Sequence, residues 1–198
     1  MKLYTNVASP FARKCRVIAH ELSLKLEEIR TLPMRDPEFR RINPLGKIPA
    51  LILDDGSVLI DSPVICEYLN HAGGGKFFPN NSIWKEDSRR WKTLGLQALG
   101  DGLADAAVAW MIEGRQQPIN EAMRARHMAA VMATLDVLER ATFAEDPSIG
   151  EIAVGCALGY LDFRMLDLDW KSSRPRLAGW YAKFCEYPSM KATGPAQP

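Results

Sequence analysis

The pattern of apolar residues changes close to Gly73, and this change limits the chain to a fold with two differently built parts. Before it, short alternating segments predict strands, and longer segments with apolar residues three and four apart predict helices. A βαβ unit followed by a ββα unit is typical of a small α/β sandwich, so residues 1–75 are predicted to form one domain. In chain order we expect a strand at 1–5, a helix at 10–23, a strand at 26–31, a helical turn at 37–42, strands at 49–53 and 57–60, and a helix at 63–72.

Beyond a linker predicted at 76–83, the chain has the pattern of helices throughout. Ser148 and Glu151 have the spacing of a capping box, which marks a helix start. The run from Ile152 to Leu161 is apolar on nearly every face, so its helix is expected in the middle of its domain. The fold class is therefore α/β plus all-α, with the α/β domain followed by an all-helical bundle domain at 84–198. The expected helices are 84–114, 119–142, 148–168 and 173–186.

The charge and composition exclude several classes of function. The chain has 25 basic and 24 acidic residues, a formal net charge of +1. It therefore lacks the cationic surplus that nucleic acids and anionic membranes select. No apolar run approaches the ~20 residues that cross a bilayer, and the N-terminus lacks a signal-peptide layout, so we expect a cytoplasmic protein. Four cysteines and three histidines lack the spacing of metal ligands or of a dithiol, so no metal is expected.

A Ser-Pro pair stands where the first strand gives way to the first helix. Pro10 suits a first helical turn because its φ is fixed and it lacks an amide hydrogen, and Ser9 is a favoured residue before it. Capping alone explains Ser9 without any chemistry. The apolar residues that follow recur at helical spacing and predict one buried face, with the basic side chains outside: Arg13, Lys14 and Arg16.

The same arrangement occurs a second time, at Asp61-Ser62-Pro63, which again follows a strand and begins a helix. Two polar-capped helix starts are then expected at the same end of one sheet. Each helix start carries partial positive charge and free amide donors, so each can hold an anion. The pair predicts a ligand with two anionic groups.

The segment from Asn43 to Pro49 lies between these two helix starts in the sequence. Pro49 opens a strand, where a missing amide does least harm, and its position makes a cis peptide bond a candidate. A cis bond would turn the backbone N–H and C=O of Ile48 outward. An extended, peptide-like ligand could pair with them as a strand would.

These segments, in this order, resemble the glutathione transferase family. The resemblance covers essentially the whole chain. It implies a thioredoxin-like first domain, an all-helical second domain and glutathione as the co-substrate. The segments that carry it are Ser9-Pro10-Phe11, residues 43–49, Asp61-Ser62-Pro63, residues 101–105 and the capping box at 148–151.

The resemblance also implies roles for individual positions. Ile48, which precedes Pro49, is expected to pair with the cysteinyl backbone of glutathione. Asp61 and Ser62 are expected to hold the γ-glutamyl ammonium and carboxylate. Lys47 matches a basic residue that pairs with the glycyl carboxylate, and a solvated lysine is an equal interpretation.

In this family the residue at the position of Ser9 faces the thiol sulfur. A free thiol titrates near ~8.5, and both a hydroxyl donor and a helix N-terminus favour the thiolate. Ser9 is therefore expected to act as a hydrogen-bond donor rather than as a base. Family members with cysteine at this position favour mixed-disulfide chemistry. The serine of this chain therefore argues against that chemistry. Tyr4, Thr5 and Asn6 remain alternatives for the sulfur-facing residue.

The electrophile is expected to bind between the two domains, in an apolar pocket. Membership of the bundle core is an equal alternative for the residues of the long helix. The predicted lining consists of Phe11 and four residues of that helix: Leu103, Ala107, Val108 and Met111.

Asp101 and Asp105 are four residues apart, so they share one face of a helix and need partners. The resemblance implies that this helix lines a homodimer interface and that Asp105 reaches toward the γ-glutamyl group held by the other subunit. A surface salt bridge is the alternative.

Three functions fit this set of residues. The leading one is conjugation of glutathione to hydrophobic electrophiles. The second is another glutathione-dependent reaction on the same scaffold, such as isomerisation, peroxide reduction or dehalogenation. The third is a protein that binds glutathione or another ligand without turnover.

Overall fold

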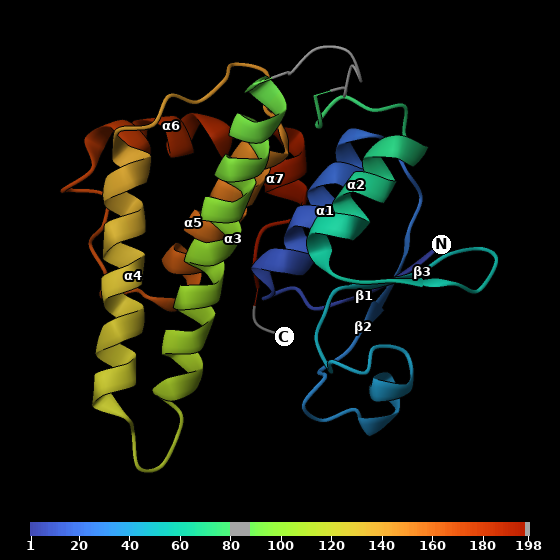
Figure 1. Cartoon of the computed structure of the whole chain (residues 1–198), viewed down its shortest axis with the longest axis horizontal. Helices are drawn as coiled ribbons and strands as arrows, with labels where there is room; N and C mark the ends of the chain where they lie inside the picture. The colour runs from blue at the N-terminus through green and yellow to red at the C-terminus, as the bar shows by residue number, and fades with distance from the viewer. Residues whose placement is uncertain (80–87, 197–198) are drawn as a thin grey trace.

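The computed structural model describes residues 1–79 and 88–196, which form an α/β domain packed against a group of helices (Figure 1). The fold class predicted from the sequence is confirmed. The predicted linker at 76–83 and the predicted start of the first long helix at 84 lie partly outside the described residues.

Four short strands form one mixed sheet with the order β2-β1-β3-β4. β1 runs parallel to β2 and antiparallel to β3, and β3 runs antiparallel to β4. Leu3 of β1 stands opposite Leu51 of β3, and both side chains are fully buried. The strands are β1 (Lys2–Thr5), β2 (Glu27–Arg30), β3 (Ala50–Ile52) and β4 (Val58–Leu59).

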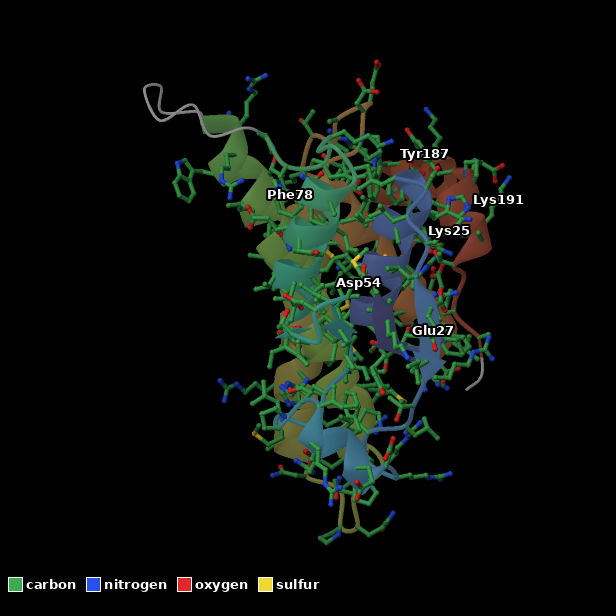
Figure 2. All side chains as sticks on the ribbon, turned by 90° about the vertical axis from the view of Figure 1, so that its right-hand side faces the viewer. Lys25, Glu27, Asp54, Phe78, Tyr187 and Lys191 are labelled. Carbon is green, nitrogen blue, oxygen red and sulfur yellow. The ribbon has the colours of Figure 1, made fainter. Side chains whose placement is uncertain are left out.

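Charged groups lie along the solvent side of this sheet (Figure 2). The N-terminal ammonium lies 2.7 Å from a carboxylate oxygen of Asp54, and the Nζ of Lys2 lies 3.6 Å from a carboxylate oxygen of Glu27. Exposed pairs of this kind contribute little to stability. They mark the face of the α/β domain that the helices leave open.

Helices α1 (Pro10–Glu21) and α2 (Ser62–Ala72) lie between the sheet and the helical domain (Figure 1). α1 packs against α2 and β1 on one side and against α3, α5 and α7 on the other. It is therefore buried on two sides. A short 3-10 helix, η1 (Pro37–Arg41), lies in the connection from β2 to β3.

The helical domain is arranged around α5, which is buried along most of its length and packs against α3. A Cβ added at Gly100 of α3 would lie 2.6 Å from backbone atoms of Ala153 and Val154, so glycine allows this close approach. The predicted capping box is present, since the Ser148 amide donates to Glu151 Oε2 at 2.9 Å. The helices are α3 (Ser88–Glu113), α4 (Glu121–Glu139), α5 (Ile149–Arg164), α6 (Pro175–Phe184) and α7 (Pro188–Ala192).

The prediction that Arg13 and Lys14 lie outside is wrong. Their relative exposures are 4% and 1%. Arg13 Nη2 donates to the carbonyl oxygen of Met190 at 3.0 Å, and Lys14 Nζ donates to both carboxylate oxygens of Asp101 at 2.6 and 2.7 Å. The apolar residues of α1 correctly mark the face that packs toward the sheet. The opposite face, which was predicted to be in contact with solvent, is covered by the helical domain.

Helix α7 was not predicted, because five residues are too few to show a helical period. It lies against α1 and contributes the carbonyl group that binds Arg13. None of the helices in the part of the chain that the structure describes is long and apolar enough to span a membrane.

Candidate functional site

The start of α1 presents a serine hydroxyl. Ser9 is the N-cap residue, and its Oγ accepts a hydrogen bond from the Ala12 amide at 3.2 Å. A hydroxyl also carries one donor hydrogen, which this capping bond does not use. Because Ser9 is only half-buried, its O–H can donate to a ligand atom at the end of the helix.

The loop before β3 presents an unpaired peptide group. The Ile48–Pro49 peptide bond is cis, as the sequence suggested. Asn43 Nδ2 donates to the Lys47 carbonyl oxygen at 2.6 Å and fixes the loop. No residue in the described ranges hydrogen-bonds to the backbone N–H or C=O of Ile48. This backbone is therefore free to pair with an extended ligand.

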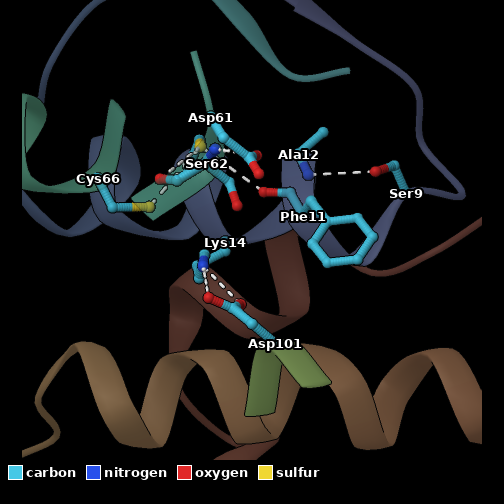
Figure 3. Close-up of polar contacts among 9 residues, drawn as sticks. Ser9, Phe11, Ala12, Lys14, Asp61, Ser62, Cys66 and Asp101 are labelled. Atoms are coloured by element: carbon cyan, nitrogen blue, oxygen red, sulfur yellow. Dashed lines mark hydrogen bonds and ion pairs between the residues drawn. The ribbon is translucent and has the colours of Figure 1, made fainter. Parts of the chain in front are cut away.

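The start of α2 presents a carboxylate and a buried hydroxyl. Asp61 is the N-cap residue and accepts a hydrogen bond from the Ser62 amide. Asp61 is exposed, whereas Ser62 is 1% exposed. Figure 3 shows Asp61 and Ser62 above the Lys14–Asp101 pair, with Ser9 at the start of α1 farther to the right.

A cavity of about 390 Å³ lies at the start of α2, and we call it the α2 cavity. Its walls come from the loop before β3, from the beginnings of α1 and α2, and from α3. It therefore gathers the predicted residues Lys47, Ile48, Asp61, Ser62 and Asp105 around one space.

A second cavity, of about 510 Å³, adjoins the first, and we call it the α5 cavity because α5 forms part of its wall. Phe11, Lys47, Ile48 and Asp105 line both cavities, so they meet at these side chains. Ser9 lines the α5 cavity. A ligand that pairs with Ile48 can thus place one end in the α2 cavity and another beside Ser9.

The predicted electrophile pocket is only partly reproduced. Phe11, Val108 and Met111 line the α5 cavity. Leu103 and Ala107 are fully buried in the core of the helical domain instead. They lie on the face of α3 that packs inside the bundle, which is the alternative that the sequence left open.

The alternatives to Ser9 are placed less favourably. Thr5 is fully buried and lines neither cavity, and the ring of Tyr4 packs against Phe39 with centroids 5.4 Å apart. Asn6 lines the α5 cavity, but its Oδ1 accepts a hydrogen bond from the Ala8 amide at 2.9 Å. Ser9 is thus the hydroxyl that stands at the edge of this cavity from the start of α1.

The carboxylates of α3 differ from each other in their surroundings. Asp101 is paired with buried Lys14, which supplies a partner of the kind that this carboxylate was expected to need. Burial raises the pKa of Asp101, and Lys14 opposes that shift. Burial also raises the pKa of Asp105, with further increases from Asp101 and Asp61 and an opposing effect of Lys47. Asp105 lines both cavities of its own chain, where the resemblance implied a role toward the other subunit.

Three polar residues of the α5 cavity were not found from the sequence. Tyr160 and Arg164 are four apart on α5, and this spacing was the available signal, although it falls at the end of a run interpreted as core. Arg115 follows the end of α3 and carried no signal, because only the folded chain brings it to the same cavity.

The first domain of the chain matches the family model "Glutathione S-transferase, N-terminal domain" over residues 8–72, and the second matches "Glutathione S-transferase, C-terminal domain" over residues 121–183. A GST-like protein of Escherichia coli (strain K12), YibF, is 34% identical over 188 residues, which cover 89% of this chain and 90% of that protein.

Solved structures agree with these matches. A glutathione transferase family member from Pseudomonas fluorescens Pf-5 with bound glutathione has 39% sequence identity and a TM-score of 0.89, with 99% of each chain covered. A structure of the protein from that organism with bound S-(propanoic acid)-glutathione has 38% identity and a TM-score of 0.88 over the full length of both chains. Since both domains match in order and the similarity extends over nearly the whole length, this chain belongs to the glutathione S-transferase family.

Proposed function

We propose that the protein is a cytoplasmic glutathione transferase, which activates the thiol of bound glutathione for attack on hydrophobic electrophiles. The observation that carries this proposal is the unpaired peptide group of Ile48 at the meeting point of two cavities, with a capped helix start on each side. An extended tripeptide with an anionic group at each end is complementary to this arrangement.

In the proposed complex, the γ-glutamyl end of glutathione occupies the α2 cavity. Its ammonium lies near the carboxylates of Asp61 and Asp105, and its carboxylate lies at the start of α2 beside Ser62. The cysteinyl backbone pairs with Ile48, whose peptide group has no hydrogen-bond partner in the described part of the chain. Lys47, which is exposed at the edge of both cavities, pairs with the glycyl carboxylate.

The thiol then lies at the start of α1. Ser9 donates its hydroxyl hydrogen to the sulfur, and the partial positive charge of the helix start adds to the stabilisation of the thiolate. A pKa lower by one unit gives about ten times more thiolate at neutral pH, because a free thiol titrates near ~8.5. The thiolate attacks an electrophile held in the α5 cavity against Phe11, Val108 and Met111.

The relatives support a site of this kind. The Pseudomonas fluorescens protein binds glutathione and also a thioether of glutathione, and a thioether is the type of product that conjugation gives. In this chain the α5 cavity, which adjoins the proposed glutathione site, offers the space for such a substituent.

Calorimetric titration with glutathione, followed by turnover measurements with an aromatic halide and with an organic hydroperoxide, tests the proposed function. We expect glutathione binding and conjugation of the halide. Absence of binding would contradict the glutathione site. Binding without turnover of either substrate would indicate a binding protein, and turnover of the hydroperoxide alone would indicate a peroxidase.

The cysteines support the cytoplasmic assignment. All four are free thiols, including Cys15 and Cys66, whose sulfur atoms lie 3.7 Å apart in the core. Burial raises the pKa of the Cys15 thiol well above its usual value, so it is a poor nucleophile. A protein that keeps such a pair reduced suits a reducing compartment, where glutathione is also held as the thiol.

We further propose a homodimer that forms through the outer faces of α2 and α3. Val64 on α2 and Trp91 and Leu99 on α3 are apolar and exposed by 49%, 66% and 36%. Exposed apolar side chains of this size on neighbouring helices favour a protein contact. Light scattering coupled to size-exclusion chromatography should give twice the mass of the 22.1 kDa chain, and a Trp91→Glu variant should elute as the monomer.

A further inference from the structure

The α5 cavity contains a cationic wall in addition to its apolar residues. Arg115, Tyr160 and Arg164 all line it. Tyr160 and Arg164 are four residues apart on α5, so their side chains share one face of that helix, and Arg115 arrives from the turn after α3. We call these three residues the cationic wall.

The charges around this cavity are unbalanced. Among the described residues that line it, Lys47, Arg115 and Arg164 are basic, and Asp105 is acidic. No carboxylate in the described ranges lies within salt-bridge distance of Arg115. Three basic side chains against one carboxylate give this part of the cavity a positive potential, which favours a ligand with a negatively charged group over a neutral apolar one.

The hydroxyl of Tyr160 lies within the electrostatic influence of both guanidinium groups. Burial raises the pKa of Tyr160, and Arg164 and Arg115 each oppose that rise. The phenol therefore stays protonated at neutral pH and can donate a hydrogen bond. Two guanidinium groups and one phenol hydroxyl together match the oxygen atoms of a carboxylate.

We propose that the electrophile is an apolar molecule that carries a carboxylate, and that Arg115, Arg164 and Tyr160 bind this carboxylate while the reacting carbon lies beside Ser9. This inference rests on the proposed transferase function. For a benzylic halide such as para-(chloromethyl)benzoate, the glutathione thiolate forms the S–C bond and chloride leaves with the electron pair of the C–Cl bond. The thiol proton is released to solvent, and no oxidant or reductant is needed.

The conjugates themselves test the proposal without turnover. We compare S-(para-carboxybenzyl)glutathione with its neutral carboxamide, S-(para-carbamoylbenzyl)glutathione, by calorimetric titration. The wild-type protein should bind the carboxylate about tenfold more tightly, because a hydrogen bond to a charged group is worth about one decade of affinity. Arg115→Gln and Tyr160→Phe should each reduce this preference to about threefold or less.

Arg126→Gln is the matched control, because Arg126 is an exposed arginine of α4 that lies outside the cavity. It changes the net charge equally and should keep the wild-type preference. Circular dichroism confirms that each variant is folded. Arg115→Gln is the substitution least able to disturb packing, because Arg115 is exposed.

The outcomes separate this inference from the proposed function. If glutathione itself does not bind, the proposed function fails. If glutathione binds and the two conjugates bind equally, or if Arg115→Gln and Arg126→Gln show the same preference, only the cationic wall is refuted. If Arg115→Gln weakens unsubstituted glutathione as much as it weakens the carboxylate conjugate, Arg115 binds glutathione, and the inference is also overturned.

Discussion

Helices α1 and α2 begin with the same Ser-Pro pair, yet they present different chemistry at their starts. In α1 the cap is Ser9, whose hydroxyl can still donate a hydrogen bond. In α2 the cap moves one residue earlier, to Asp61, and Ser62 becomes a buried residue of the first turn. A carboxylate only accepts hydrogen bonds, so one helix start suits a thiolate and the other an ammonium.

The bodies of the two helices also differ. α2 packs against α1 and β3 and leaves side chains such as Val64 exposed. α1 lies between the two domains and buries the Lys14–Asp101 pair on its second side. The shared motif therefore determines where ligand groups can bind, whereas burial determines how much of the stability depends on each helix.

The largest effect is expected for the buried pair. Asp101→Asn leaves the Lys14 ammonium without its carboxylate in a site where Lys14 is 1% exposed. Breaking a buried pair in this way typically costs about 3 kcal/mol, which lowers the melting temperature of a chain of this size by about 6–12 °C. Thermal unfolding followed by circular dichroism measures this loss.

The double variant Lys14→Met, Asp101→Asn is the control for that loss. It removes the ammonium as well, so most of the stability should return, because an apolar side chain of similar length needs no partner. If the double variant is as unstable as Asp101→Asn alone, the loss comes from packing at Asp101 and the ion pair is not its cause. No comparable change is available in α2, whose exposed face carries its charges in water.

Ser9→Ala separates the chemistry of the two helix starts. Loss of the hydroxyl donor should raise the pKa of the bound thiol by about one unit and lower kcat/KM by about tenfold to a hundredfold, whereas the dissociation constant of glutathione should change little. The thiolate absorbs in the ultraviolet, so a pH titration of the complex measures its pKa. The lost cap also costs about 1 kcal/mol of stability.

Ser9→Thr keeps both a hydroxyl and a capping oxygen, so it should retain most of the activity and stability. If Ser9→Ala keeps the wild-type thiol pKa, Ser9 acts only as a cap. Asn6, which lines the same cavity, then becomes the next residue to test.

Asp61→Asn tests the other helix start. The amide keeps the capping acceptor but loses the charge that is proposed to face the ligand ammonium, so the dissociation constant of glutathione should rise about tenfold with little change in kcat. A glutathione analogue without the amino group is the control ligand, and it should bind wild type and variant alike. A lower kcat at saturating glutathione would contradict a role limited to binding.

The difference between the two helices also shows what could be predicted from the sequence. Ser9, Ile48 and Asp61 could be singled out from the sequence because helix caps and a strand-opening proline are local features, and the structure places all three in the walls of adjoining cavities. The burial of Arg13 and Lys14 was missed because it depends on a domain that follows much later in the chain.

Long-range packing also explains the remaining differences between the predicted and the observed lining of the site. Leu103 and Ala107 face the interior of the bundle. The spacing of apolar residues along α3 could not show which apolar positions face the interior and which face the cavity. Arg115 and Tyr160 are 45 positions apart in the printed sequence, and no local pattern connects them before the chain folds.

The smallest effect is expected for Asp105. This residue lines both cavities but, unlike Ser9 and Asp61, it does not cap a helix. Because its pKa is raised in the folded chain, the unfolded chain releases this proton at a lower pH, and stability falls as the pH rises through the two pKa values. Asp105→Asn should therefore raise the melting temperature slightly at pH 7, and the gain should shrink as the pH falls toward about 4, near the pKa of a free aspartate. The variant should also bind glutathione about threefold more weakly, because one carboxylate near the ammonium is lost. A gain in stability without any loss of affinity would show that Asp61 alone binds the ammonium, which would sharpen the contrast between the starts of α1 and α2.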